Sequence, residues 1–150
     1  MRSPVLSFGK RRVSVDANII MAVVAYNSKS LPPVFDRIRR KDTLVVTNII
    51  MMQCLRQTRK KQCRLTEEQI RTAVLGLCPE ITIVDILPLE ELRKRYSIRD
   101  ESDLETLHSI AASGTDVFIT GDGDFRDPKR PIGGVKVVVL TPNEYLEEGE

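Results

Sequence analysis

The sequence predicts an α/β domain, a three-layer α/β/α sandwich with a central, mainly parallel sheet. Short apolar or β-branched runs alternate along the chain with segments that have helical spacing, and right-handed crossovers then place helices on both faces of a parallel sheet. The 150 residues are 41% hydrophobic, enough for one globular domain to bury its own core. We therefore expect a single domain over residues 1–150, in which residues 1–10 form an N-terminal extension.

The elements follow one another in a regular order. Each strand is expected to be short and each helix to begin soon after the strand before it. Strands are expected at residues 11–16, 43–46, 81–86, 117–119 and 135–140. Helices are expected at residues 17–26, 34–38, 48–61, 66–76, 89–96, 102–113 and from 142 onward.

Three helix starts carry a capping box, in which a hydroxyl residue is followed three positions later by Glu or Gln. These pairs are Thr66 with Gln69, Ser102 with Glu105, and Thr141 with Glu144, the last with a proline at the first helical position. The second box would place Asp103 at the first position of its helix.

Composition and cysteine usage narrow the setting of the protein. No uncharged stretch is long enough to span a bilayer, and the N-terminus lacks an apolar segment followed by a cleavage site. We therefore expect a cytoplasmic protein without a membrane partner. Three cysteines without CxxC spacing and a single histidine, His108, give little support to a zinc site. We expect the cysteines and His108 to be core or partly buried residues.

Aspartates from distant parts of the chain are expected at one edge of the sheet. Asp16 follows the first strand, Asp122 follows the strand at 117–119, Asp103 opens a helix, and Asp124 adds a fourth acid. Ligands bind such sheets beyond the carboxyl ends of the strands. Two like charges 4 Å apart repel by about 4 kcal/mol at an effective dielectric near 20. A cluster of this kind therefore indicates a bound cation, and oxygen ligands suit Mg²⁺ or Mn²⁺ and the hydrolysis of phosphodiesters.

Each aspartate also has a purely structural explanation. Asp16 could cap the first helix, and Asp103 could complement the dipole of its helix. Asp122, between two glycines, and Asp124, which follows the second of them, could form an ordinary turn.

Three segments resemble the PIN-domain family of metal-dependent ribonucleases, in particular the toxins of prokaryotic toxin–antitoxin pairs. They are VDAN at the first strand, SDLETLHSIAASGTDVFITGDGDF, and VVVLTPNEYL, and the similarity extends over about residues 12–146. The resemblance implies an RNA substrate, a cognate antitoxin protein and a homodimer. It implies that Asp16, Asp103 and Asp122 are catalytic and bind Mg²⁺ or Mn²⁺, that Asp124 is an additional acid, and that Asn18 and Thr120 orient ligands or water.

One position departs from this family. The family usually has a glutamate about six residues after a Ser or Thr that follows the second strand; counted from Thr47, that position is Gln53. No acidic residue occurs anywhere from Thr43 to Thr66. A glutamine offers a carbonyl oxygen but no charge and no base. Two hypotheses remain open: a weak or fewer-ligand nuclease, or a PIN-like domain that has lost catalysis and binds RNA or protein.

A basic run follows the helix that carries Gln53. The segment RQTRKKQCR, residues 56–64, contains five basic residues in nine. Such a run is usually a solvated helix end. Next to an acidic sheet edge it could instead follow an RNA backbone, with Arg56, Arg59 and Lys60 as substrate-binding residues.

Overall fold

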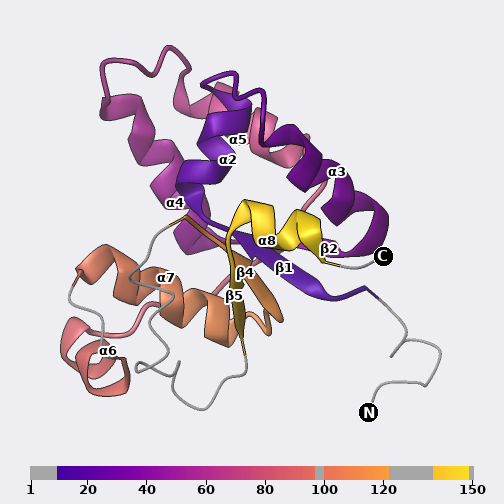
Figure 1. Cartoon of the computed structure of the whole chain (residues 1–150). Helices are drawn as coiled ribbons and strands as arrows, with labels where there is room; N and C mark the ends of the chain where they lie inside the picture. Colours follow the sequence, from indigo (N-terminus) through magenta and orange to yellow (C-terminus); the bar gives the residue numbers. More distant parts are fainter. Residues whose placement is uncertain (1–9, 97–99, 122–136, 149–150) are drawn as a thin grey trace.

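A computed structural model of the chain describes residues 10–96, 100–121 and 137–148 (Figure 1). The expected N-terminal extension lies almost entirely outside these ranges. A five-stranded parallel sheet with strand order β3-β2-β1-β4-β5 forms the centre, which confirms the predicted α/β architecture. The strands are β1 (Arg12–Val15), β2 (Thr43–Thr47), β3 (Glu80–Thr82), β4 (Val117–Ile119) and β5 (Val138–Leu140).

Helices cover the sheet on two sides. In Figure 1, α2, α3 and α5 lie on one side and the pair α6 and α7 on the other. The helices are α2 (Ala17–Val24), α3 (Pro32–Lys41), α4 (Asn48–Arg56), α5 (Glu67–Leu75), α6 (Leu89–Arg95), α7 (Glu101–Ala112) and α8 (Pro142–Glu147), and the short 3-10 helix η1 (Gln57–Arg59) continues α4. Within the described residues no helix is long and apolar enough to cross a membrane.

The strand order reverses between β1 and β4. The chain moves outward through β2 and β3 on one side of β1, and through β4 and β5 on the other. Val13 and Val15 of β1 lie opposite Val117 and Ile119 of β4, in parallel register. The carboxyl ends of β1 and β4 therefore form the switch point at which α/β sheets bind ligands.

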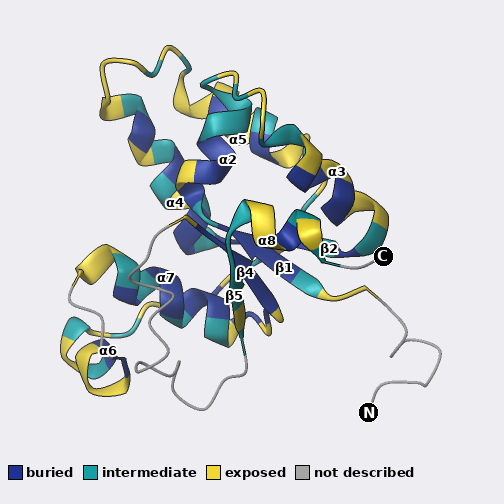
Figure 2. Cartoon of the chain, viewed as in Figure 1, coloured by how far each residue is buried: buried dark blue, intermediate teal, exposed yellow. Residues whose placement is uncertain are grey.

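The core lies between the sheet and its helices (Figure 2). The apolar residues of the three inner strands, β1, β2 and β4, are fully or almost fully buried, as in parallel sheets covered on both faces, whereas Ile81 of β3 and Val138 of β5 are exposed on the edge strands. On the α7 face, two buried hydroxyl pairs hold the chain to the sheet. Thr47 Oγ1 of β2 lies 2.9 Å from Ser109 Oγ of α7, and Ser14 Oγ of β1 lies 2.7 Å from Thr115 Oγ1, which follows the end of α7. The first contact fixes α7 on β2, and the second fixes the segment between α7 and β4 on β1.

Two of the three predicted capping boxes are confirmed, at Thr66 and at Thr141. The third is wrong. Asp100 is the N-cap of α7, because its side chain accepts a hydrogen bond from the backbone N–H of Asp103 at 3.1 Å. The helix begins at Glu101, so Asp103 is its third residue and not its first.

Other boundaries also differ from the expected ones. The third strand ends at Thr82 because the side chain of Asn48 binds the next part of the backbone: its Oδ1 accepts from Val84 N–H at 2.8 Å and its Nδ2 donates to Val84 C=O at 3.0 Å. The helix expected to reach residue 61 changes to 3-10 geometry after Arg56. Cys78 is exposed, contrary to expectation, whereas Cys54 is buried.

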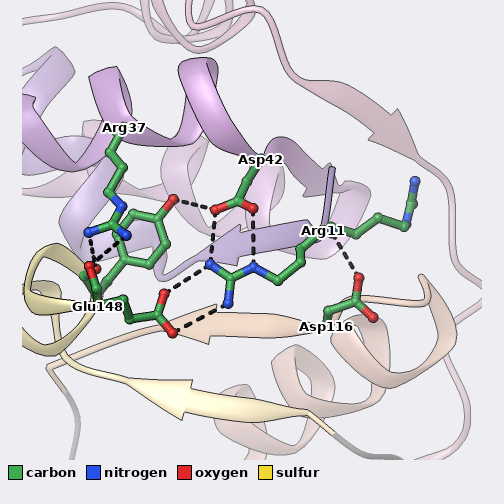
Figure 3. Close-up of polar contacts among 7 residues, drawn as sticks. Arg11, Arg37, Asp42, Asp116 and Glu148 are labelled. Carbon is green, nitrogen blue, oxygen red and sulfur yellow. Dashed lines mark hydrogen bonds and ion pairs between the residues drawn. The ribbon is translucent and has the colours of Figure 1, made fainter. Parts of the chain in front are cut away.

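A polar cluster of Arg11, Arg37, Asp42, Tyr145 and Glu148 holds α8 at the amino ends of β1 and β2 (Figure 3); we call it the Asp42 cluster. Asp42 accepts two hydrogen bonds from Arg11, at 3.1 and 3.2 Å, and one from the Tyr145 hydroxyl at 2.5 Å. Arg11 also pairs with Glu148 at 2.9 Å. Arg37 donates to the backbone carbonyls of Tyr145 and Glu148 at the end of α8. Every acidic group of the cluster thus has a cationic partner.

Candidate functional site

Asp16 joins the two central strands at the switch point. It follows β1 directly and its backbone N–H donates to Ile119 C=O of β4 at 2.9 Å. One carboxylate oxygen accepts from the backbone N–H of Asn18 at 3.0 Å, which makes Asp16 the N-cap of α2. The other oxygen accepts from the buried hydroxyl of Thr120 at 2.8 Å. The helix-cap explanation of Asp16 is therefore correct, and the cap also fixes the carboxylate at the ligand-binding edge of the sheet.

Asp103 reaches the same place from the other face of the sheet. Its position in the first turn of α7 follows from the Asp100 cap, and the hydroxyl contact between Ser109 of α7 and Thr47 of β2 holds that helix against the sheet. A pocket of about 230 Å³ forms between the starts of α2 and α7 and the outer face of α4. Its lining residues are Asp16, Ala17, Asn18, Gln53, Arg56, Gln57, Ser102, Asp103 and Thr106. Two carboxylates 87 positions apart in the sequence therefore share one pocket.

Gln53 binds α7 through its amide nitrogen. Its Nε2 donates to Thr106 Oγ1 at 2.6 Å and to Ser102 Oγ at 3.1 Å. Thr106 Oγ1 in turn donates to the backbone carbonyl of Ser102 at 2.9 Å, so it can only accept from Gln53. The nitrogen of the amide is therefore the atom that faces these two side chains, and the oxygen is the atom left to serve a ligand in the pocket.

Gln57 makes a second set of amide contacts one turn farther along. It is buried, accepts from the Tyr26 hydroxyl at 3.1 Å and donates to Asn18 Oδ1 at 3.2 Å. Gln53, Arg56 and Gln57 all line the pocket because positions i, i+3 and i+4 share one side of a helix.

The structure brings together four of the residues singled out from the sequence, Asp16, Asn18, Arg56 and Asp103, and places Thr120 directly behind Asp16. Asp122 and Asp124 lie outside the described residues. Sequence reasoning missed Gln57, Ser102 and Thr106 as lining residues. Gln57 could have been found from its spacing of four residues after Gln53, and Thr106 from its spacing of three residues after Asp103.

The described part of the pocket contains hard oxygen donors and little opposite charge. In the ranges that the structure covers, no three His, Cys, Asp or Glu side chains are grouped closely enough to hold a metal, and the third expected acid of the site falls outside those ranges. The polar groups that line it, apart from Arg56, are two carboxylates, three amides and two hydroxyls. Oxygen donors of this kind fit magnesium or manganese better than softer metals.

Arg59 and Lys60 extend the charge of Arg56 away from the pocket. Arg56, Arg59, Lys60, Lys61 and Arg64 are all exposed. No carboxylate of the described residues forms an ion pair with any of these five side chains. We call these five residues the basic run; it is a positive surface that begins at the pocket itself, on a protein whose net charge is only +2.

The Cys54 thiol and the His108 imidazole, which are potentially reactive groups, have structural environments. Burial, and then the charge of Asp16, raises the pKa of the Cys54 thiol to about 12, so Cys54 is not a nucleophile at neutral pH. His108 is partly buried, with its Nδ1 3.4 Å from the Tyr96 hydroxyl, as expected for a structural histidine.

Comparison with known proteins identifies the fold. No protein-family model matches the chain, and no curated protein sequence matches it. Among solved structures, the chain is similar to a chain of VapBC2 from Rickettsia felis bound to a promoter DNA fragment, with a TM-score of 0.58 and 15% identity over 87% of this chain and 98% of that one. It is also similar to a chain of DNA-bound VapBC from Salmonella typhimurium, with a TM-score of 0.59 and 14% identity over 86% and 98%. The PIN-like fold expected from the sequence is thus confirmed.

Proposed function

We propose that this protein is a metal-dependent endoribonuclease that hydrolyses RNA phosphodiester bonds and is the toxin-like component of a toxin–antitoxin pair. The observation that carries this proposal is the pocket at the β1/β4 switch point, where Asp16 and Asp103 converge from opposite faces of the sheet. The similarity of the fold to VapBC chains supports the same class of protein.

Asp16 and Asp103, with Asp122, would hold a divalent Mg²⁺ or Mn²⁺ ion, and Asp124 would be an additional acid. The donor set fits such an ion, because it consists of hard oxygens and because two described carboxylates share a pocket of about 230 Å³. Bound there, the ion would lower the pKa of a water and neutralise charge on the phosphate. Thr120 and the backbone of Asn18 keep Asp16 in one orientation, so the carboxylate needs no rearrangement to receive a ligand.

The basic run would bind the RNA backbone. Arg56 is at the pocket, and Arg59 and Lys60 continue from it on η1 and the following turn. Unpaired exposed cations release counterions when they bind phosphates, which makes binding salt-dependent. Replacing Arg59 and Lys60 by glutamine should reduce the slope of log affinity against log salt by about 0.7 per contact for single-stranded RNA. The double variant Arg93→Gln/Lys94→Gln on α6 removes the same charge elsewhere and should leave the slope unchanged.

A second candidate is a PIN-like domain that binds RNA or a protein without cleaving it. Gln53 favours this alternative, because the position carries no charge and its amide nitrogen is bound by α7. A cognate antitoxin and a homodimer belong to both proposals.

Cleavage assays distinguish the two candidates. Structured and single-stranded RNAs would be incubated with the protein in manganese, and in parallel with a chelator. The nuclease proposal requires products that disappear with the chelator and in Asp103→Asn but persist in Asp36→Asn, a matched change at an exposed site on α3. RNA binding without products under any of these conditions would support the binding module instead.

A further inference from the structure

Hydrogen bonds connect Tyr26, Gln57 and Asn18 into a chain that ends at the pocket. The Tyr26 hydroxyl donates to Gln57 Oε1 at 3.1 Å, and Gln57 Nε2 donates to Asn18 Oδ1 at 3.2 Å. Gln57 is only 9% exposed, so its amide groups depend on these partners. The chain therefore has a direction, because each donor in it determines the next acceptor.

The direction of the chain determines which end of the Asn18 amide is available. Burial, and then Cys63, raises the pKa of Tyr26, so the hydroxyl keeps its proton and remains a donor throughout the neutral range. Asn18 Oδ1 is occupied by Gln57, while the Asn18 side chain is exposed and lines the pocket. The NH₂ group of Asn18 is then the part of the amide that is open to a ligand.

We propose that Gln57 is a positioning residue that holds Asn18 as a hydrogen-bond donor, so that Asn18 and Arg56 form a subsite for a phosphate oxygen. This inference rests on the proposed function and assigns a task within the same pocket. Arg56 precedes Gln57 directly, lines the pocket and makes no ion pair with any described carboxylate.

A donor at this position is needed because of the charge of Asp16. The carboxylate of Asp16 repels a phosphate, and the carbonyl of a flipped Asn18 amide would add a second unfavourable dipole. An NH₂ group and a guanidinium reverse that balance, because they offer a phosphate oxygen hydrogen-bond donors within the same pocket as the carboxylates.

Neutral substitutions test the positioning role without changing the charge of the pocket. Gln57→Met removes both amide contacts, Tyr26→Phe removes the donor that orients Gln57, and Asn18→Ala removes the proposed phosphate donor. Gln62→Met makes the same substitution at an exposed position of the turn after η1 and serves as the control. Thermal melting of each variant shows whether it is folded.

Inorganic phosphate is the probe, titrated in magnesium and followed by the side-chain amide signals of Asn18 in a proton–nitrogen correlation spectrum. We expect these signals to shift on phosphate addition in the wild type. Asn18→Ala should weaken phosphate binding about tenfold, as for loss of a hydrogen bond to a charged group, and Gln57→Met and Tyr26→Phe by a few-fold. Gln62→Met should bind as the wild type does.

The double variant Asn18→Ala/Gln57→Met provides the decisive comparison. If Gln57 acts only through Asn18, the double variant should bind phosphate no more weakly than Asn18→Ala alone. Additive losses, or Asn18 amide signals that do not respond to phosphate in the wild type, would overturn the inference. Cleavage of RNA is measured separately, so a protein that fails to cleave but shows these shifts disproves the nuclease proposal and not this one.

Discussion

The buried or partly buried carboxylates at the two ends of the central strands have different hydrogen-bond partners. At the amino ends, Asp42 is 4% exposed, yet it has two bonds from Arg11 and one from the Tyr145 hydroxyl. At the carboxyl ends, Asp16 accepts only from neutral groups, a backbone N–H and the hydroxyl of Thr120. Within the described residues, no cation forms an ion pair with Asp16, although Arg56 lines the same pocket.

This difference separates charges that hold the fold from charges that are ready for a ligand. A buried carboxylate without a counter-charge is costly, so the Asp42 cluster supplies that charge from the protein itself. At the other end of the sheet no described side chain forms an ion pair with Asp16, which is instead oriented as a helix cap and by the hydroxyl of Thr120. A divalent ion would complete the pocket as Arg11 completes the Asp42 cluster.

The largest expected effect is that of Asp103→Asn on the pocket. Loss of a proposed metal ligand should lower the rate of RNA cleavage by at least about a hundredfold. Mutating a residue that only hydrogen-bonds to a metal ligand already lowers metal affinity or activity by about 10- to 100-fold. The same variant should lose the rise in melting temperature that manganese causes in the wild type. A large destabilisation in the absence of metal would mean that Asp103 stabilises the fold, as Asp42 does.

At the other end of the strands, Asp42→Ala should have the opposite profile. Removing this carboxylate leaves the buried Tyr145 hydroxyl without its acceptor and Arg11 without its principal partner, and should destabilise the protein by about 3 kcal/mol. Urea unfolding measures the change, and Asp36→Ala at an exposed position is the matched control. The stabilisation by manganese should be retained, because the Asp42 cluster lies at the far end of the sheet. A loss of metal response in Asp42→Ala would contradict the separation of the two ends.

Gln53→Glu should make the stability of the protein depend more strongly on a bound metal ion. The hydroxyl of Ser102 can rotate to donate to a carboxylate, whereas the hydroxyl of Thr106 would have to leave the Ser102 carbonyl to do so. A third acid should lower the melting temperature of the protein without metal. It should also raise the affinity for manganese by about tenfold, which corresponds to about 1.4 kcal/mol, and the attraction between a carboxylate and a nearby cation at an effective dielectric near 20 is large enough for this gain. Calorimetric titration with manganese measures this gain.

Cleavage by Gln53→Glu is the second readout of the same variant. If the missing charge limits the enzyme, its rate should rise above that of the wild type. Gln69→Glu is a matched control, since a glutamate preserves the capping box of α5. Unchanged metal affinity in Gln53→Glu would mean that the oxygen of residue 53 does not reach the ion.

Much of the fold could be predicted because the relevant signals are local. Strand runs, helical periods and the boxes at Thr66 and Thr141 depend on neighbouring residues, and all of these elements are present. The errors arose where another group competed with the expected one. Asp100, three positions before Asp103, binds its N–H and moves the start of α7, which is a competition between two local signals. Asn48, 36 positions before Val84, binds its backbone and shortens β3, which is a long-range effect.

The site was partly predictable for the same reason. Asp16 could be placed at the sheet edge because it directly follows a strand, whereas Asp103 was expected there from the resemblance to PIN domains. The partners of Gln53 and Gln57 could not be predicted, because Thr106 is 53 positions from Gln53 and Asn18 is 39 positions from Gln57. Which amide atom faces the pocket depends on these long-range hydrogen bonds, and no periodicity in the sequence encodes it.

The smallest expected effect concerns Tyr145 at high pH. Burial, followed by the hydrogen bond to Asp42, raises the pKa of Tyr145 above its ordinary value, so the unfolded chain loses this proton at a lower pH than the folded protein. The contribution is fully present below the ordinary tyrosine pKa of about 10 and is lost as the pH rises toward the folded value. Stability should fall by about 1 kcal/mol over the first pH unit above that value. The raised pKa of Cys54 acts in the same direction, so urea unfolding of Tyr145→Phe against wild type isolates the tyrosine. Parallel pH profiles for the two proteins would mean that the Tyr145 proton is as easily lost in the folded state as in the unfolded one.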